Sequence, residues 1–465
     1  NKDKILIEKI EKITIESPPE KINFDLSTNI PMILAKYNKK KPEDMALQIK
    51  KILEKEITDF ENIEIAKPGF LNINLSNRAL NIFIKKVFLK SEKYGSNDFK
   101  KNYNIEFVSA NPTGPMHIGH LRGAIFGDVL SNLLKFNGSK VIKEFYINDY
   151  GNQIENFTKS VFYRIREIKK KEKFPSEKDL YPGKYIKEIA NNIIKQNPKL
   201  DFASYEKDYS LIRKNSIDAS MKFIKDDLKK LGIIHDNFIS ETQILKKIDL
   251  KKLFSKLKKE KLVFEGYLEP PKGEEQDNWK KTRKLIFKTT FFGDDIDRAL
   301  QKNDGTWTYF ANDIAYHSDK ISRKYDILIN ILGADHTGYI KRITSAVEAL
   351  SKGKVILKCK VCQLVKLFKE GKPFKMSKRA GEFISANDLL TEVGKDAIRF
   401  MMLNRSNDVE LDFDFKKVIE RTKDNPVFYV QYCYARISSL LRTLKIKKNQ
   451  KIKPDKNFSL NVYEN

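Results

Sequence analysis

The sequence predicts an α/β fold in which strands, loops and helices alternate around a parallel sheet, and two stretches carry this prediction. Residues 104–153 and 306–348 both contain apolar runs with strand or helix periodicity. The first stretch is expected to contain, in order, a strand at 105–109, a Pro/Gly-rich loop, a helix at about 119–136 and a strand at 141–147. Each stretch has a polar loop directly after a strand, so both loops are expected at the carboxyl edge of one sheet.

The first 98 residues read as a separate small α+β unit. Apolar periodicity predicts helices at 30–35, 43–53 and 77–89, and a hairpin formed by 63–65 and 70–75. No group of side chains in this unit has the pattern of a catalytic site. We therefore interpret it as a binding or packing module.

The loop after the first core strand holds His117-Ile118-Gly119-His120 at the mouth of the predicted helix. A helix N-terminus presents backbone N–H groups and the positive end of the helix dipole, which suits a phosphate group. The two imidazoles can face one ligand, and Gly119 lets that ligand come close. The alternative is that both histidines are ordinary surface or capping residues.

Residues 157–302 are lysine-dense and helical in pattern, and they lie between the two α/β stretches. We predict a basic helical insertion whose charges form solvated helix faces. Near its end, residues 285–292 are expected to form a strand, and 293–300 with 302–310 a turn and a further strand.

The second α/β stretch is expected to place a helix carrying Asp313 and His317 before an apolar strand at 326–332. Gly333-Ala334-Asp335-His336 follows as a loop that opens another helix. Three of the five histidines (His117, His120 and His336) thus fall on two loops at strand ends.

A third group of polar residues lies at 371–381, a glycine-flanked loop with three cations in five residues: Lys375, Lys378 and Arg379. Such a loop can follow a polyphosphate whose charge develops during a reaction. A solvated basic turn and a contact to a nucleic-acid backbone are the alternatives.

The composition narrows the class of protein. A formal charge of +27, from 89 Lys+Arg against 62 Asp+Glu, suits a nucleic-acid partner, although drift toward Lys, Ile and Asn explains part of the excess. No run of about 18 apolar residues is present, so no membrane span is expected. The chain begins with Asn1 rather than Met, so we expect a fragment or a trimmed chain.

Three cysteines are too few for a disulfide framework and favour a reducing compartment, so we expect a cytoplasmic protein. Cys359 and Cys362 have the CxxC spacing, but they lie in a β-like run at 355–367 where the two side chains should face opposite ways. We interpret them as structural rather than metal-binding.

The early His117–His120 motif (HIGH) and the late Lys375–Lys378 motif (KMSK) together resemble class I aminoacyl-tRNA synthetases. The flanking blocks are similar to arginyl-tRNA synthetases over about residues 22–440: EFVSANPTGPMHIGHLRG, YINDYGNQI, WTYFANDIAYH, GADHTGYIKR, KMSKRAGEF, GKDAIRFMML and NPVFYVQYCYARI. Lys378 is present and Gly114 occupies the loop before His117, which resembles the branch of the family with the complete KMSK motif.

The resemblance implies a fold and a division into domains. The expected parts are an N-terminal tRNA-contacting domain (1–98), a Rossmann-like catalytic domain (99–365) with the insertion at about 157–302, a connecting region with the KMSK loop (366–423) and the start of a truncated α-helical anticodon-binding domain (424–465). It also implies a ligase that activates L-arginine with ATP and transfers it to the 3′-terminal adenosine of tRNA(Arg). We expect a monomer.

The resemblance also assigns roles to residues. His117, His120, Lys375 and Lys378 would be catalytic. The ATP site would consist of His117, Gly119, His120, Gly333, Asp335, His336, Lys375, Met376, Ser377 and Lys378, with Mg²⁺ arriving together with ATP and no tightly bound metal or organic cofactor. The arginine site would consist of Glu106, Ser109, Asn111, Tyr309 and Asp313, with Glu106 and Asp313 pairing the guanidinium. An internal salt bridge is the alternative for these two carboxylates.

Two other function classes remain open at this point. One is a class I synthetase for another amino acid or a related nucleotidyltransferase, because HIGH and KMSK alone specify only the class. The other is a non-catalytic RNA-binding homologue, against which the intact motifs argue.

Overall fold

The structure is a computed structural model that describes residues 5–7, 10–19, 21–268, 282–369, 371–374 and 384–446. It divides into two compact units, one formed by residues 1–96 with 445–465 and the other by residues 97–444. Within the described residues no helix is both long enough and apolar enough to cross a membrane.

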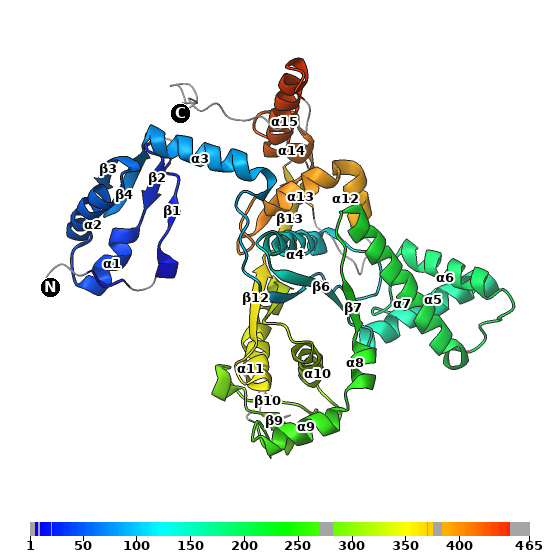
Figure 1. Ribbon diagram of the computed structural model, residues 1–465. Helices are drawn as coiled ribbons and strands as arrows, with labels where there is room; N and C mark the ends of the chain where they lie inside the picture. Colours follow the sequence, from blue (N-terminus) through cyan, green and yellow to red (C-terminus); the bar gives the residue numbers. More distant parts are fainter. Residues whose placement is uncertain are drawn as a thin grey trace. The chain divides into compact units, whose positions relative to one another are not determined.

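The first unit is an antiparallel sheet packed against helices (Figure 1). The sheet has the order β1 (Ile15–Glu16), β2 (Leu26–Thr28), β4 (Phe70–Leu75), β3 (Phe60–Ala66), and the helical segments are η1 (Ile10–Lys12), α1 (Ile30–Asn38), α2 (Pro42–Glu56), α3 (Asn77–Lys90) and η2 (Ser91–Lys93). Met45 and Ala46 of α2 are fully buried against Leu71 of β4. The predicted hairpin and helices of this unit are confirmed, because each has a clear apolar face or turn signal in the sequence.

The second unit is built on a five-stranded parallel sheet. Its order is β12 (Ile356–Cys362), β11 (Ile327–Gly333), β5 (Asn102–Glu106), β6 (Lys140–Ile147), β7 (Asn237–Ser240). The chain builds outward from β5 through β6 to β7, and later adds β11 and β12 on the other side of β5. The strand order therefore reverses between β5 and β11, where ligands bind in open α/β sheets.

Helices cover both faces of this sheet (Figure 1). On one face lies α4 (Ile118–Phe136), and on the other lie α10 (Tyr309–Ser322) and α11 (Ile340–Ser351). Phe145 of β6 packs in the core with α4, whereas its neighbour Tyr146 packs toward α10, as alternation along a strand requires. The predicted α/β fold with a parallel sheet is confirmed. The first strand, however, ends at Glu106 rather than at residue 109.

The region 157–302 differs from the predicted helical insertion. It begins within α5 (Asn152–Lys170) and continues through α6 (Lys184–Gln196) and α7 (Tyr205–Lys230), which share an apolar core. It then supplies β7 to the central sheet, and the second half of α7 is buried against α4. β7 was not predicted, because its four residues are too few for a periodic pattern and its place is set by the parallel pairing with β6.

The rest of this region forms a small antiparallel sheet with two helices. The elements are α8 (Glu241–Lys247), α9 (Leu250–Lys259), β8 (Val263–Gly266), β9 (Lys284–Phe287), the 3₁₀ turn η4 (Thr290–Phe292) and β10 (Arg298–Ala299). The strand predicted at 285–292 thus ends at Phe287. The further strand expected within 293–310 corresponds to the two-residue β10, which pairs with β9. From Tyr309 the chain is helical instead, because the Thr308 hydroxyl accepts a hydrogen bond from the Ala311 amide and caps α10.

The predicted β-like run at 355–367 is two strands, β12 and β13 (Val365–Lys369). Cys362 packs in the core on the α4 face and Cys359 packs against the core on the opposite face, which confirms that the two thiols point apart. β13 pairs with β14 (Lys372–Phe374) and β15 (Leu411–Asp414). The helices that follow β14 are α12 (Ala386–Val393), α13 (Lys395–Leu403), α14 (Phe415–Ile419) and α15 (Pro426–Thr443).

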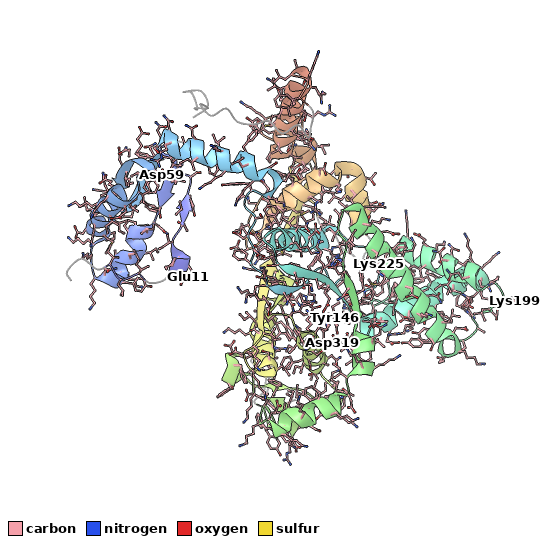
Figure 2. The ribbon with its side chains drawn as sticks, viewed as in Figure 1. Glu11, Asp59, Tyr146, Lys199, Lys225 and Asp319 are labelled. Atoms are coloured by element: carbon pink, nitrogen blue, oxygen red, sulfur yellow. The ribbon has the colours of Figure 1, made fainter. Side chains whose placement is uncertain are left out.

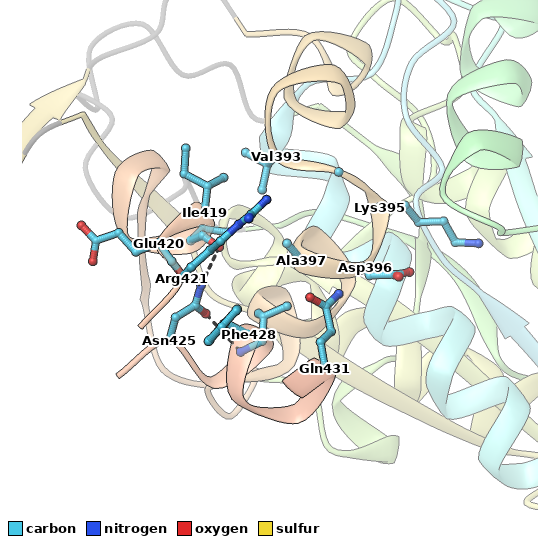
Figure 3. Close-up of a pocket in the computed structure, with 13 residues that line it drawn as sticks. Val393, Lys395, Asp396, Ala397, Ile419, Glu420, Arg421, Asn425, Phe428 and Gln431 are labelled. Atoms are coloured by element: carbon cyan, nitrogen blue, oxygen red, sulfur yellow. Dashed lines mark hydrogen bonds between the residues drawn. The ribbon is translucent and has the colours of Figure 1, made fainter. Parts of the chain in front are cut away.

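A cavity of about 510 Å³ lies between α13, α14 and α15 (Figure 3). Asn425 closes one side of it. Its side-chain amide donates to the backbone carbonyls of Val418 (2.9 Å) and Glu420 (2.7 Å), and its side-chain oxygen accepts from the Val427 amide at the start of α15. Asn425 therefore fixes where α15 begins.

Arg122 of α4 is 1% exposed and joins α4 to the β13–β15 region. Its guanidinium donates to the carbonyls of Gln363 (2.9 Å), Ser406 (2.7 Å) and Val409 (2.7 Å). Because its side chain is buried and its guanidinium donates to three backbone carbonyls, Arg122 is a structural residue rather than a surface cation.

We expect Arg122→Ala to lower the free energy of unfolding by about 3 kcal/mol, because it leaves several carbonyls without a donor. Urea unfolding followed by circular dichroism measures this loss. Arg442→Ala, at an exposed position of α15, is the matched control and should change stability by less than about 0.5 kcal/mol. Equal effects of the two substitutions would contradict the assignment.

Candidate active site

The candidate site lies where β5 and β11 end side by side. The loop after β5 leads into α4, and the loop after β11 leads into the 3₁₀ segment η5 (Ala334–Tyr339). Both predicted polar loops are therefore at the same edge of the sheet. This edge is also the point at which the strand order reverses.

His117 and His120 form a reciprocal cap at the start of α4. The His117 Nδ1 accepts a hydrogen bond from the Gly119 amide and the His120 Nδ1 accepts one from the His117 amide, both at 3.2 Å. Their rings stack with centroids 3.9 Å apart and planes 27° apart. The capping role considered as an alternative is thus present, and it holds both imidazoles at the positive end of the helix.

The four KMSK residues Lys375, Met376, Ser377 and Lys378 lie outside the described residues. The chain on either side of them is described. β14 leads into the loop, and on its far side Ser385 forms a β-bridge with His117. The Ala386 amide also donates to the carbonyl of Met116 (2.9 Å). The segment that follows the loop therefore lies against the start of α4.

Glu106, the last residue of β5, is held by a buried ion pair. Lys320 of α10 is 0% exposed, and its Nζ lies 2.5 Å from the Glu106 Oε2 and 3.1 Å from the Asn330 Oδ1. The Tyr316 hydroxyl donates to the same Glu106 oxygen (3.1 Å), and the Ser109 hydroxyl donates to Oε1 (3.0 Å). For Glu106 the internal salt bridge considered as an alternative is present, with Lys320 as the cation.

A second buried carboxylate lies beside Glu106, at the paired position of the neighbouring strand. Glu144 of β6 accepts hydrogen bonds from Tyr316 and from two nitrogens of Arg323. Burial alone would raise the pKa of Glu144, but the Arg323 hydrogen bond and the charges of Lys320 and Arg323 lower this pKa to about 2. The Arg323 Nε also contacts Asp319 (3.0 Å), which Figure 2 labels on α10. The floor of the site is therefore a fixed network of charges.

The backbone after Glu106 is strained. Val108 and Ser109 have φ values of 71° and 38°, in the left-handed region that non-glycine residues rarely adopt. The Ser109 hydroxyl also accepts from the Tyr146 amide (3.1 Å), which fixes this turn to β6. Further along the loop, the side-chain amide of Asn111 donates to the Gln153 Oε1 (2.6 Å) at the start of α5.

Asp313 is half-buried in the second turn of α10, where the Tyr339 hydroxyl donates to its carboxylate. Burial raises the pKa of Asp313 to about 7, and the nearby charges of Glu241 and Glu106 contribute in the same direction. Tyr309, one turn earlier, is 63% exposed. It borders a cavity of about 990 Å³ that Asn312 and Gly151 also line.

Four carboxylates, Glu106, Asp149, Glu241 and Asp313, converge on Tyr146, which Figure 2 labels at the end of β6. Burial raises the pKa of the Tyr146 phenol and these four charges raise it further. Glu241 is 4% exposed and accepts from the Asn312 amide (2.8 Å). We call this group the acidic cluster. Such a cluster favours a cationic ligand that shares its charge among several carboxylates.

The loop after β11 is more open. Asp335 and His336 are exposed and lie 3.5 Å apart (Oδ2 to Nε2). A Cβ at Gly333 would come within 2.5 Å of the Asp335 carboxylate, which is exposed and can move aside. Within the described residues, no group of three or more His, Cys, Asp or Glu side chains could hold a metal ion.

Sequence reasoning missed Glu241, Lys320, Tyr316 and Gln153. Tyr316 and Lys320 are in the same helical run as Asp313. Their spacings of three and seven residues from it were a signal that could have placed them on the same side of α10. Glu241 had no such signal, because β7 before it was not recognised as a strand.

Two family models match the chain. The catalytic-domain model of the class I tRNA synthetases (R) matches residues 83–439, and the model of the arginyl tRNA synthetase N-terminal domain matches residues 3–75. The chain belongs to the arginyl-tRNA synthetase family.

The chain is similar in sequence to members of the arginyl-tRNA synthetase family over most of its length. The chain is 56% identical over 444 residues to the arginine–tRNA ligase of Pelagibacter ubique, covering 95% of this chain and 77% of that protein, and 47% identical over 434 residues to that of Wolbachia pipientis wMel, covering 92% and 75%. A solved arginyl-tRNA synthetase structure from Campylobacter jejuni is similar with a TM-score of 0.68 and 33% identity, covering 80% of this chain and 78% of that one. A Thermus thermophilus structure (TM-score 0.65, 19% identity, covering 93% and 78%) has the same fold.

We expect Lys320→Met to lower the free energy of unfolding by about 3 kcal/mol, because it leaves the charge of Glu106 buried without its cation. Chemical unfolding at pH 7.5 measures the loss. Lys320→Met combined with Glu106→Gln should recover part of it, since the double variant leaves no unpaired charge at this contact. Additive losses would mean that the ion pair does not couple the two residues.

Proposed function

We propose that this member of the arginyl-tRNA synthetase family is an arginine–tRNA ligase. It activates L-arginine with ATP to give arginyl-adenylate and pyrophosphate, and then transfers the arginyl group to the 3′-terminal adenosine of tRNA(Arg). The observation that carries this proposal is the pairing of opposite electrostatic sites at one sheet edge. The α4 N-terminus suits phosphate, and the acidic cluster suits a guanidinium.

In the first step an oxygen of the arginine carboxylate attacks the α-phosphorus of ATP, the bond to the β-phosphate breaks, and pyrophosphate leaves. The protein needs to position the reactants and to stabilise the charge that develops, without a covalent nucleophile of its own. We assign His117, Gly119 and His120 to the triphosphate together with the α4 N-terminus. Lys375 and Lys378 would bind the leaving pyrophosphate, and Met376 and Ser377 would complete that loop. Gly333, Asp335 and His336 would contact the adenosine half.

Mg²⁺ would enter with ATP, bound mainly by phosphate oxygens and water. Carboxylates would then be needed only at the edge of the ion, which suits a site without a dense cluster of ligands.

For arginine, Asp313 is the group best suited to the guanidinium. Its carboxylate lies beside Glu241 and Glu106 without a lysine or arginine bonded to it among the described residues, whereas Glu106 already pairs with Lys320. We assign Glu106 Oε1, Ser109 and Asn111 to the α-amino end and Tyr309 to the wall of the side-chain site. Neutral isosteres such as citrulline would leave the carboxylates unpaired and should be rejected.

In the second step the ribose hydroxyl of the terminal adenosine attacks the adenylate carbonyl and AMP leaves. The formal charge of +27 supports binding of tRNA mainly through its phosphates. We further propose that residues 1–98 contact the tRNA and that the region from 424 begins an anticodon-binding module. The enzyme would act as a monomer in the cytoplasm.

The function is tested by ATP–pyrophosphate exchange with each of the twenty amino acids in the presence of tRNA(Arg). We expect arginine alone to support exchange, at least 100-fold above lysine, because only a planar guanidinium matches paired carboxylates. tRNA is included because the resemblance implies that it stimulates activation. Exchange with a different amino acid would indicate another class I synthetase. Binding of tRNA without exchange would indicate a non-catalytic homologue.

The raised pKa of Asp313 predicts that arginine binding is linked to a proton. Below pH 7 this carboxyl is mostly protonated in the free enzyme, and the guanidinium requires it ionised, so binding should release up to one proton. The Kd for arginine should fall about tenfold per pH unit between pH 5.5 and 6.5 and level off above pH 8. Isothermal titration calorimetry in buffers of different ionisation enthalpy measures both quantities.

The variant Asp313→Asn removes the ionisable carboxyl group and tests this assignment. It should weaken arginine binding at least 100-fold at pH 8 while leaving the Kd of a non-hydrolysable ATP analogue within about twofold. Arginine affinity that is independent of pH, or an equal loss of both ligands in the variant, would remove Asp313 from the guanidinium site.

A further inference from the structure

The loop between β5 and the histidine pair is held by a helix that sequence reasoning placed in the insertion. The Ser220 hydroxyl of α7 accepts from the Gly114 amide (2.7 Å) and lies 3.3 Å from the Gly114 carbonyl. Two turns later on α7, the Asp227 Oδ2 accepts from the Met116 amide (3.3 Å). Because Pro115 has no N–H, these two bonds use both amides of the segment 114–116.

The partners are buried and rigidly placed. Ser220 is 0% exposed, Asp227 is 4% exposed and Met116 is 0% exposed. Residues seven apart lie on one face of a helix, so both polar side chains point toward the loop. Gly114 has φ +143°, and a Cβ there would come within 2.6 Å of the Tyr185 ring on α6. The position therefore admits no side chain, and the loop backbone packs directly against the helices.

Met116 also connects this loop to the segment after the KMSK residues. Its amide donates to Asp227 of α7, and its carbonyl accepts from the Ala386 amide at the start of α12 (2.9 Å). The next residue, His117, bridges Ser385. Ser385 is fixed in turn by a reciprocal cap with Asp388. The backbone of a single residue, Met116, thus lies between α7 and α12, directly before the candidate catalytic histidines.

The charges around Asp227 come from two elements. Asp226 and Lys230 face it from α7, and Asp388 faces it from α12. Burial raises the pKa of Asp227 to about 6, while the Met116 amide and Lys230 act in the opposite direction. Asp227 is consequently ionised at pH 7.5 and accepts the Met116 hydrogen bond as a carboxylate, the stronger acceptor.

We propose that Asp227 and Ser220 are positioning residues for the activation step. They set the position of His117 and His120 and fix this position relative to Ser385 and Ala386, which follow the KMSK residues in the chain. This rests on the proposed function. Asp227 acts through the backbone of Met116 and does not touch the substrates. Ser220 and Asp227 bond residues 114 and 116, which come after the Ser109 and Asn111 positions assigned to arginine. Loss of Asp227 should therefore impair ATP use and leave the arginine site intact.

The experiment compares Asp227→Ala, Asp227→Asn and Ser220→Ala in the full chain, by arginine-dependent exchange with tRNA(Arg) and by calorimetry with arginine and with a non-hydrolysable ATP analogue. We expect Asp227→Ala to lower kcat/KM for ATP at least tenfold and to leave the Kd of arginine within twofold. Ser220→Ala should give the same ATP-selective loss, about threefold. Asp227→Asn keeps an acceptor oxygen and should stay within about threefold of wild type at pH 7.5.

A pH profile separates this role from a merely structural one. At saturating arginine, the ratio of wild-type to Asp227→Asn activity should fall toward one as the pH is lowered from 7.5 to 5.5. The reason is that only the wild type has a carboxylate at this position, and it becomes protonated near pH 6. Asp226→Asn is the matched control, since Asp226 is exposed and pairs with Lys222 (2.7 Å). It should change neither kcat/KM for ATP nor the Kd of arginine.

Unchanged ATP parameters in Asp227→Ala would overturn the proposal, and so would equal losses for ATP and arginine in both Asp227→Ala and Ser220→Ala. If Asp227→Ala does not fold, Ser220→Ala and the pH ratio decide the outcome. A wild-type chain without arginine-dependent exchange would overturn the proposed function instead, and ATP-analogue binding would still test the positioning role.

Discussion

The buried ion pair between Glu106 and Lys320 is the contact on which the candidate site depends. It joins the end of β5 to α10, and Lys320 also bonds Asn330 of β11, so one ammonium ties together the two strands between which the sheet order reverses. Tyr316 extends the link to Glu144 of β6, and Arg323 neutralises Glu144 from the same helix. Burying a charge pair this deeply costs desolvation free energy, and the attraction between the charges offsets this cost only when their geometry is fixed. The fixed ion pair therefore also holds β5, β11 and α10 in place around the site.

The same network explains how opposite charges can lie close together without cancelling. Lys320 and Arg323 neutralise the carboxylates of Glu106 and Glu144. Among the hydrogen bonds found for the described residues, Asp313 and Glu241 accept only from neutral donors. Burial and mutual repulsion raise the pKa of Asp313 as a result. Eleven residues after Glu106, the His117 cap presents a positive helix end. The strained turn at Val108 and Ser109 lies between Glu106 and the His117 cap, so the strain is located between the carboxylates and the helix N-terminus.

Helices, strands and loops could be predicted from the sequence wherever a periodic pattern or a turn signal was carried by consecutive residues. The α4 helix, the hairpin of the first unit and the two strand-end loops all had periodicity or turn residues, and they were predicted within a few residues. Lys320 could not be interpreted in this way, because a lysine in a helical run is usually solvated and only the tertiary fold buries it to 0% exposure. β7 was missed because four residues carry no period, and Glu241 was lost with it. The KMSK residues were recognised by resemblance, and their placement remains a prediction.

The α7 helix shows why the charge of a segment is a poor guide to its role. Its surface carries many of the lysines that made residues 157–302 look like a solvated insertion, and those positions tolerate compositional drift because water screens them. Its buried face carries Ser220 and Asp227, two polar groups with specific backbone partners in the loop before His117. A buried polar group without its partner is costly, so such positions cannot drift in the same way. The net charge of +27 therefore says less about mechanism than the few charges that the fold removes from water.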